Sequence, residues 1–326
     1  KMMVGDMVNE KQKGLAYSIQ SFLCNAGSLV GFLFPFIFTW IGISNIAPQG
    51  VVPDSVIYSF YIGAAILILC VIYTTVKVKE MPPAEYAEYH GITEEEEKEK
   101  INMVKLLIKA PKAFWTVGLV QFFCWFAFMF MWTYTNGSVA ANVFDAPTVE
   151  TAVNGVSKVM LDTKSIQYQD AADWVGVLFA VQAIGSVLWA VCIPLFKDRK
   201  LIYSLSLVLG GLGFISTYFV HNQYVLFISF LLIGCAWAAM LALPFTILTN
   251  ALSGGHMGTY LGLFNGTICI PQIVAASLGG SILALFTPKG MLPPEINMLV
   301  MAGVMLIIGA VCVYLIKETK GEQTKA

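Results

Sequence analysis

Long, uninterrupted apolar runs are the feature that most constrains the fold of this chain. Eight such runs recur along the 326 residues, and a helix needs roughly 20 apolar residues to cross a bilayer. Because the runs are continuous, they differ from the short alternating strands of a membrane β-barrel. The sequence therefore predicts an all-α polytopic membrane protein with eight transmembrane helices, at residues 15–43, 55–76, 113–135, 173–196, 201–220, 224–248, 258–286 and 296–316.

The composition agrees with this prediction. Apolar residues make up 57% of the chain and charged residues 12%, and the mean hydropathy is +0.74. A soluble domain carries roughly 25% charged residues, so the natural partner of this surface is a lipid bilayer and not a nucleic acid. The chain contains no HExxH, GxSxG or Walker motif, and its seven cysteines have no metal-binding spacing. We therefore expect no enzyme activity, no catalytic residue, no metal and no cofactor.

The distribution of Lys and Arg predicts the orientation in the membrane. If the loops alternate and 77–112 is inside, 16 of the 19 basic residues fall on the inner side. The remaining three are Lys158, Lys164 and Lys289. Cytoplasmic loops carry an excess of Lys and Arg, so we expect a multi-pass protein of the plasma (inner) membrane with both ends in the cytoplasm.

One long polar linker divides the chain. Residues 77–112 contain a charged run, 94–100, followed by apolar residues at helical spacing among lysines. This pattern predicts an amphipathic helix on the inner membrane surface. The predicted organisation is an N-terminal part at 1–76, the linker at 77–112, a six-helix half at 113–316 and a cytoplasmic tail at 317–326.

A weak internal repeat extends this organisation. The segment that begins at Gly5 resembles the one that begins at Thr249, at a constant offset of 244 residues, with Gly14 aligned to Gly258. Repeats of this kind are typical of transporters built from two related halves. If each segment opens the fifth crossing of a six-helix half, we expect a bundle of twelve helices, of which this chain contributes eight.

Polar and aromatic side chains within the predicted spans form stripes at helical spacing, such as Gln121, Trp125, Met129 and Trp132 in 113–135 and Gln182, Ser186 and Trp189 in 173–196. Polar residues within a span usually face a bundle interior or an aqueous cavity. Amides donate to and accept from hydroxyl groups, and an aromatic face packs on the apolar side of a sugar ring, so the stripes predict a sugar site. The alternative is that amides join helices by hydrogen bonds and that Trp lies at the membrane interface. We expect the substrate cavity to be lined by Gln121, Trp125, Gln182, Asn265 and Gln272, with Gln20 and Asn25 from the other half.

Two further patterns concern packing and charge. The glycine pairs Gly27/Gly31 and Gly262/Gly266, and the run 210–213, predict close helix contacts. No Asp, Glu, Lys, Arg or His lies well inside a span. A protein driven by protons generally needs a titratable group in its pathway, so that group is expected upstream of Lys1 or at Asp6.

Two sequence blocks carry a resemblance to a known family. GCAWAAMLALPF contains Gly234, Trp237 and Pro244, and GTYLGLFNGTICIPQ contains Asn265 and Gln272. With Lys1 and Asp6 in KMMVGD and KDRK at 197–200, the chain resembles the major facilitator superfamily over nearly its whole length. Within it, the chain is similar to the sucrose/maltose proton symporters and the related glycoside–pentoside–hexuronide carriers.

The resemblance implies an alternating-access carrier that is a monomer and takes up a disaccharide or glucoside together with a proton. It implies that Trp237 and Pro244 belong to a mobile gating helix, and that Asp6, Asp198 and Arg199 lie at the inner gate. Two alternatives stay open: a same-fold exporter or permease for a drug, lipid or muropeptide, and a membrane sensor that binds a ligand without moving it.

Overall fold

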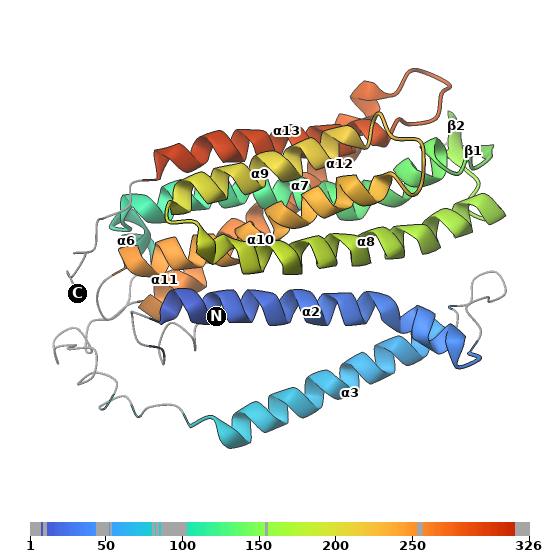
Figure 1. The fold of residues 1–326 in the computed structure, drawn as a ribbon. Coiled ribbons are helices and arrows are strands. Elements are labelled where there is room, and N and C mark those ends of the chain that lie inside the picture. The colour runs from blue at the N-terminus through green and yellow to red at the C-terminus, as the bar shows by residue number, and fades with distance from the viewer. Residues whose placement is uncertain are drawn as a thin grey trace.

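The described part of the chain folds into a bundle of long helices with one short β-hairpin (Figure 1). The computed structural model describes residues 8, 12–43, 52, 54–79, 82, 85, 103–153, 156–252 and 257–316. Asp6, Lys1 and the tail at 317–326 lie outside these residues. The elements are α2 (Lys13–Trp40), α3 (Asp54–Lys77), α6 (Met103–Ile108), α7 (Lys112–Asn142), β1 (Thr148–Val153), β2 (Val156–Leu161), α8 (Ile166–Cys192), η1 (Ile193–Leu195), α9 (Arg199–Ser216), α10 (Leu226–Ala251), α11 (Met257–Phe264), α12 (Gly266–Phe286), α13 (Ile296–Cys312) and η2 (Val313–Leu315).

Seven helices of the described residues are long and apolar enough to cross a membrane, and they confirm seven of the predicted spans. The eighth prediction, 15–43, falls on α2, a helix of 28 residues in which Phe22–Phe34 is an apolar stretch. The predicted span 258–286 consists of α11 and α12, which are separated at Asn265.

The two ends of the bundle carry different elements, a β-hairpin at one end and the short helix α6 at the other. At the hairpin end, the antiparallel strands β1 and β2 lie between α7 and α8, with Thr148 paired to Leu161. At the opposite end, which we call the α6 end, α6 and α11 lie beside the first turn of α7 (Figure 1). The Tyr260 hydroxyl of α11 donates a hydrogen bond to the Leu106 carbonyl of α6 over 3.2 Å. This bond fastens the linker helix to the bundle.

Close glycine contacts hold the C-terminal helices together. α10 packs against α8 and α9, and α13 packs against α7 and α9. A Cβ atom added at Gly303 of α13 would lie 2.6 Å from the carbonyl oxygen of Gly211 on α9, and one added at Gly211 would lie 2.9 Å from the carbonyl of Gly303. The prediction for 210–213 is therefore confirmed. For Gly27 and Gly31 it is wrong within the described part of the chain, since a Cβ at either glycine meets no atom within 4 Å.

The helices α2 and α3 contact the rest of the bundle very differently. α2 runs along α8 and also contacts α10, and the rings of Phe32 and Phe179 lie 5.8 Å apart across the α2–α8 contact. α3 contacts α2 but diverges from it away from the hairpin end (Figure 1). Most of its apolar side chains are exposed within the described structure, including Phe60 and Tyr61. A helix that is apolar all round is suited to lipid or to further helices.

Candidate functional site

Gln121, which the sequence predicts to line the substrate cavity, lies at the contact between α7 and α10. Gln121 is 0% exposed, and its Nε2–H group donates to the Met240 carbonyl over 3.0 Å. That carbonyl is the one that residue 244 would bond in a regular helix, but Pro244 has no N–H to offer. α10 nevertheless continues through Pro244 from Leu226 to Ala251. Gln121 therefore satisfies the carbonyl that the proline leaves without a helical partner.

The two amide atoms of Gln121 are in different situations. Nε2 is committed to Met240, whereas Oε1 is buried without a hydrogen-bond partner among the described residues. The sequence analysis interpreted Gln121 as a substrate ligand and did not foresee its contact with the proline carbonyl. The i−4 rule for prolines identifies Met240 as an acceptor, but only the fold identifies which side chain reaches it.

Beside Gln121 lies a cluster of three tryptophans, Trp125 and Trp132 from α7 and Trp237 from α10. The ring centroids of Trp125 and Trp237 are 5.8 Å apart with an edge-on interplanar angle of 76°, and Trp132 and Trp237 are also 5.8 Å apart, at 82°. Trp125 is 9% exposed, Trp132 is 43% exposed and Trp237 is half-buried. These are favourable edge-to-face geometries, and the stripe predicted on α7 thus meets the tryptophan of the predicted gating helix.

Phe128 completes this cluster on its inner side. Its ring lies 4.9 Å from Trp237 and 5.9 Å from Phe214 of α9. Phe128 is fully buried, so the cluster is anchored to the bundle core on that side. The exposed part of Trp132 leaves an aromatic surface accessible on the other.

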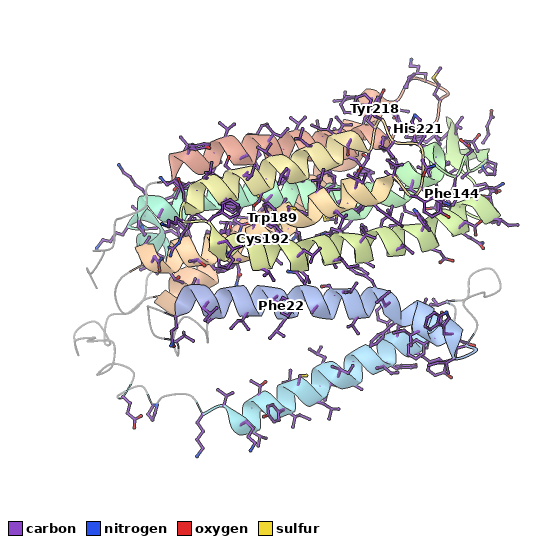
Figure 2. The ribbon with its side chains drawn as sticks, viewed as in Figure 1. Phe22, Phe144, Trp189, Cys192, Tyr218 and His221 are labelled. Atoms are coloured by element: carbon purple, nitrogen blue, oxygen red, sulfur yellow. The ribbon has the colours of Figure 1, made fainter. Side chains whose placement is uncertain are left out.

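The two stripe residues of α8, Gln182 and Trp189, are in different situations. Gln182 is 6% exposed and has no hydrogen-bond partner among the residues that the structure describes, so its amide is available. Gly234 of α10 packs directly on the backbone of α8 at Gln182 and Ser186, where a Cβ atom would not fit. Trp189, which is labelled in Figure 2, in contrast donates from Nε1 to the Ser206 hydroxyl of α9 over 2.8 Å. Trp189 therefore joins two helices.

Four predicted cavity residues lie on α2, on α12 and at the break between α11 and α12. Asn25 is buried within the bundle, and Gln20, one turn away on α2, is half-buried. Asn265 is exposed at the break between α11 and α12, and Gln272 is half-buried. No hydrogen bond or ring contact within the described parts links Asn265 or Gln272 to the tryptophan cluster. The structure thus brings α7 and α10 residues into direct contact, while α12, which carries Gln272, packs against α7 without such a contact to the tryptophans in the described structure.

Of the predicted gate residues at the α6 end, Asp198 has a clear local function as a helix cap. Asp198 is the N-cap of α9, and its Oδ1 accepts from the N–H groups of Lys200 at 2.9 Å and Leu201 at 3.1 Å. A carboxylate at this position satisfies the first N–H groups of a helix and interacts favourably with its dipole. Arg199 is exposed, and Asp6 lies outside the described residues.

An acidic residue at the hairpin end was missed by the sequence analysis. Glu295 precedes α13 and is half-buried, and a Cβ atom at Gly137 of α7 would overlap its carboxylate. Burial raises the pKa of Glu295 from the usual 4.5 to about 7. Glu295 stands one residue before the predicted span 296–316, after Pro293 and Pro294, and therefore lies outside the segments in which a charged residue signals a functional site. Its position in a proline-rich turn gave no sign of burial.

A cavity of about 540 Å³ also lies at the hairpin end. It is formed by the ends of α9 and α12 and by one face of α13, and it is almost entirely apolar. Tyr218, near His221 in Figure 2, belongs to its lining. None of the predicted substrate residues lines it; the lining comprises Ile215, Tyr218, Phe219, Phe286, Asn297, Val300, Met301, Val304 and Met305.

The sequence was compared with curated proteins and with models of protein families. A search of curated proteins found no match. The family model for the Major Facilitator Superfamily matches two stretches that overlap and together extend over almost the whole chain, residues 2–156 and 139–326. The long apolar helices and the proline-containing helix against the tryptophan cluster agree with a secondary transporter of this type. On this match, the chain belongs to the major facilitator superfamily.

Proposed function

We propose that this protein is a proton-coupled carrier that takes up a disaccharide or glucoside by alternating access. The observation that carries the proposal is the tryptophan cluster of Trp125, Trp132 and Trp237, at the contact between α7 and the proline-containing helix α10. Ligand sites combine apolar and aromatic walls with a few polar groups that fix orientation. A half-exposed indole beside available amides has this composition.

The polar part of the site comes from amides and not from charged groups. The Gln182 amide has no partner among the described residues, and the Oε1 atom of Gln121 has none either. Neutral amides suit a neutral polyol, since they both donate to and accept from hydroxyl groups. A cationic drug would need an acidic side chain in the cavity. The proposed lining contains none, and this favours a sugar as the substrate. The proposed lining is Gln121, Trp125, Gln182, Asn265 and Gln272, with Gln20 and Asn25 from α2.

α10 is the element that we expect to move. Pro244 removes one intrahelical hydrogen bond, and the Gln121 amide replaces that bond from another helix. A bond between two helices can break and reform when they separate, whereas an intrahelical bond would resist bending. Trp237 lies on the same helix as Pro244, so motion of α10 would change the shape of the aromatic surface. Substrate at the cluster would thereby be coupled to the position of α10.

The proposed orientation places the α6 end in the cytoplasm, because 16 of the 19 Lys and Arg residues fall on that side of the predicted topology. The hairpin end is then extracellular. Asp198 and Arg199, with Asp6, would form the inner gate. We propose the plasma (inner) membrane as location and a monomer as the working unit.

The test is counterflow in proteoliposomes, followed by uptake of radiolabelled maltose, sucrose and glucose with and without a protonophore. We expect saturable exchange of at least one sugar and an accumulation that collapses with the protonophore. Trp125→Ala and Gln182→Ala should each reduce exchange at least tenfold. Trp115→Ala is the matched control, because Trp115 is on α7 but is exposed and outside the tryptophan cluster.

The outcomes separate the alternatives. Exchange without a protonophore effect would contradict proton coupling and retain the sugar. Sugar binding without counterflow would favour a sensor. No binding of any sugar would refute the substrate class and favour an exporter or permease for another solute. Equal losses of exchange in Trp115→Ala and Trp125→Ala would show that the tryptophan cluster is not part of the substrate site.

A further inference from the structure

The contact between α7 and α13 at the hairpin end contains a carboxylate in an unusual position. Glu295 occupies the N-cap position of α13 with helical backbone angles (φ −59°, ψ −23°) and makes no side-chain bond to its own helix. An acid at a helix N-terminus ordinarily accepts N–H groups of the first turn. Here the carboxylate lies against Gly137, at a place where any other residue would put a Cβ atom into it. Glycine at 137 thus provides the space that the acid fills.

The surroundings of Glu295 offer no compensating positive charge. Glu295 forms no ion pair within the described structure, and the titratable neighbour that its charge affects is Tyr134, one turn from Gly137 on α7. α12 has no acidic or basic residue, and the basic residues of α7 and α9 lie at the α6 end. The basic groups at this end are Lys289 in the loop before α13, His221 after α9, Lys158 on β2 and Lys164 before α8, and none of them forms an ion pair with Glu295 in the described structure. A carboxylate half-buried without a cation is costly unless it is neutral.

We infer that Glu295 is a proton-binding site: its neutral carboxyl favours the closed α7–α13 contact at the hairpin end, and its ionised carboxylate favours the open one. The chemical step is protonation of the carboxylate oxygen by water-borne protons, with no other bond made or broken. Closing the contact takes up a proton, and opening it to water releases the proton.

The direction of the pH effect follows from linkage. The closed form binds a proton more tightly, so lowering the pH favours closure. The ratio of closed to open forms changes at most tenfold per pH unit. This change is confined to the interval between the usual carboxyl pKa of 4.5 and about 7. In an uptake cycle with the hairpin end outside, which rests on the proposed function, an external proton would be bound as the outer side closes.

Infrared spectroscopy tests the site without any substrate. The carbonyl stretch of a protonated carboxyl is followed on purified protein between pH 5 and pH 9. We expect one band that titrates near pH 7 in the wild type, persists in Asp170→Asn and is absent from Glu295→Gln. Asp170 is the matched control, an exposed acid on α8. The inference is overturned if no band titrates above pH 6, or if the same band persists in Glu295→Gln.

A second variant tests the geometry while the acid is kept. Gly137→Ala places a methyl group where the carboxylate lies, so the carboxyl should be displaced into water. Its titration midpoint should then fall by at least one pH unit. An unchanged midpoint would contradict the part played by the α7 contact.

Counterflow separates this inference from the proposed function. If a substrate is exchanged, the pH dependence of exchange between pH 5 and pH 8 should flatten at least fivefold in Glu295→Gln and remain in Asp170→Asn. An unchanged profile in Glu295→Gln would refute the link to closure. A titrating band in a protein that exchanges no sugar would instead leave the proton site intact and refute the sugar proposal.

Discussion

The Gln121 amide on α7 donates a hydrogen bond to the Met240 carbonyl on α10, the acceptor that Pro244 leaves without a helical partner. This bond explains how a proline sits in the middle of a buried helix without a break. It also makes the geometry of α10 dependent on α7. The bond therefore both stabilises α10 at the proline and links its geometry to the position of α7.

The first prediction concerns this bond. Gln121→Leu should destabilise the protein by about 1–3 kcal/mol, because a buried carbonyl would be left unsatisfied. In a Pro244→Ala background the helix supplies its own N–H to Met240, so the same change should cost about 1 kcal/mol less. The measurement is a double-mutant cycle of unfolding in detergent by SDS titration. Additive costs would show that the two sites are independent.

The second prediction separates capping from gating at Asp198. Asp198→Ala should destabilise the protein by about 0.5–2 kcal/mol through loss of the α9 N-cap, and Asp198→Ser should retain most of that stability because serine also caps helices. If the charge acts at the inner gate, Asp198→Ser should still reduce transport. Thermal unfolding and counterflow on the same preparations check this. Full activity in Asp198→Ser would leave capping as its role.

The third prediction concerns the glycine contact between α9 and α13. Gly303→Ala should destabilise the protein by about 1–3 kcal/mol, because the new Cβ would meet the Gly211 carbonyl and neither backbone can yield easily. Gly27→Ala is the control, since a Cβ there meets open space and alanine favours a helix over glycine. Thermal midpoints in one detergent make the comparison. Equal losses in both variants would contradict the packing described.

The fourth prediction is a pH dependence of stability. The pKa of Glu295 is raised by burial to about 7 in the folded protein, so its stabilising effect is fully present below about 4.5 and is lost as the pH rises through 7. Glu295→Gln should match the wild type at pH 4, below the usual carboxyl pKa of 4.5. At pH 8 it should be more stable by up to roughly 2 kcal/mol, allowing for screening of a half-buried group. A variant less stable than wild type at pH 8 would contradict this sign.

Much of the fold follows from hydropathy alone. A bilayer demands long apolar segments with internal backbone hydrogen bonds, so the positions of seven spans were predictable, although the predicted span 113–135 ends seven residues before the end of α7 and 173–196 begins seven residues after the start of α8. The β-hairpin was missed, although Thr148–Val153 and Val156–Leu161 are joined by Asn154-Gly155. That dipeptide is a strong hairpin signal, but it lies in the loop between the predicted spans 113–135 and 173–196, where hydropathy does not report on structure.

The site was less predictable than the fold. Helical spacing placed Gln121, Trp125 and Trp132 on one stripe, and the contact of Trp125 and Trp132 with Trp237 agrees with it. Spacing on one helix, however, does not say which neighbouring helix a stripe faces. Trp189 shares a stripe with Gln182 but donates to Ser206 of α9, and the burial of Glu295 depends on Gly137, more than 150 residues away in sequence.

The reciprocal contact of Gly211 and Gly303 has a mechanical consequence. Two backbones that approach so closely leave no side-chain layer through which one helix can slide or rotate past the other. α9 and α13 must therefore travel as a single rigid body during any conformational cycle. Rearrangements are left to the contacts made by longer side chains, such as those of α7 with α10, where rotamer changes can absorb the displacement.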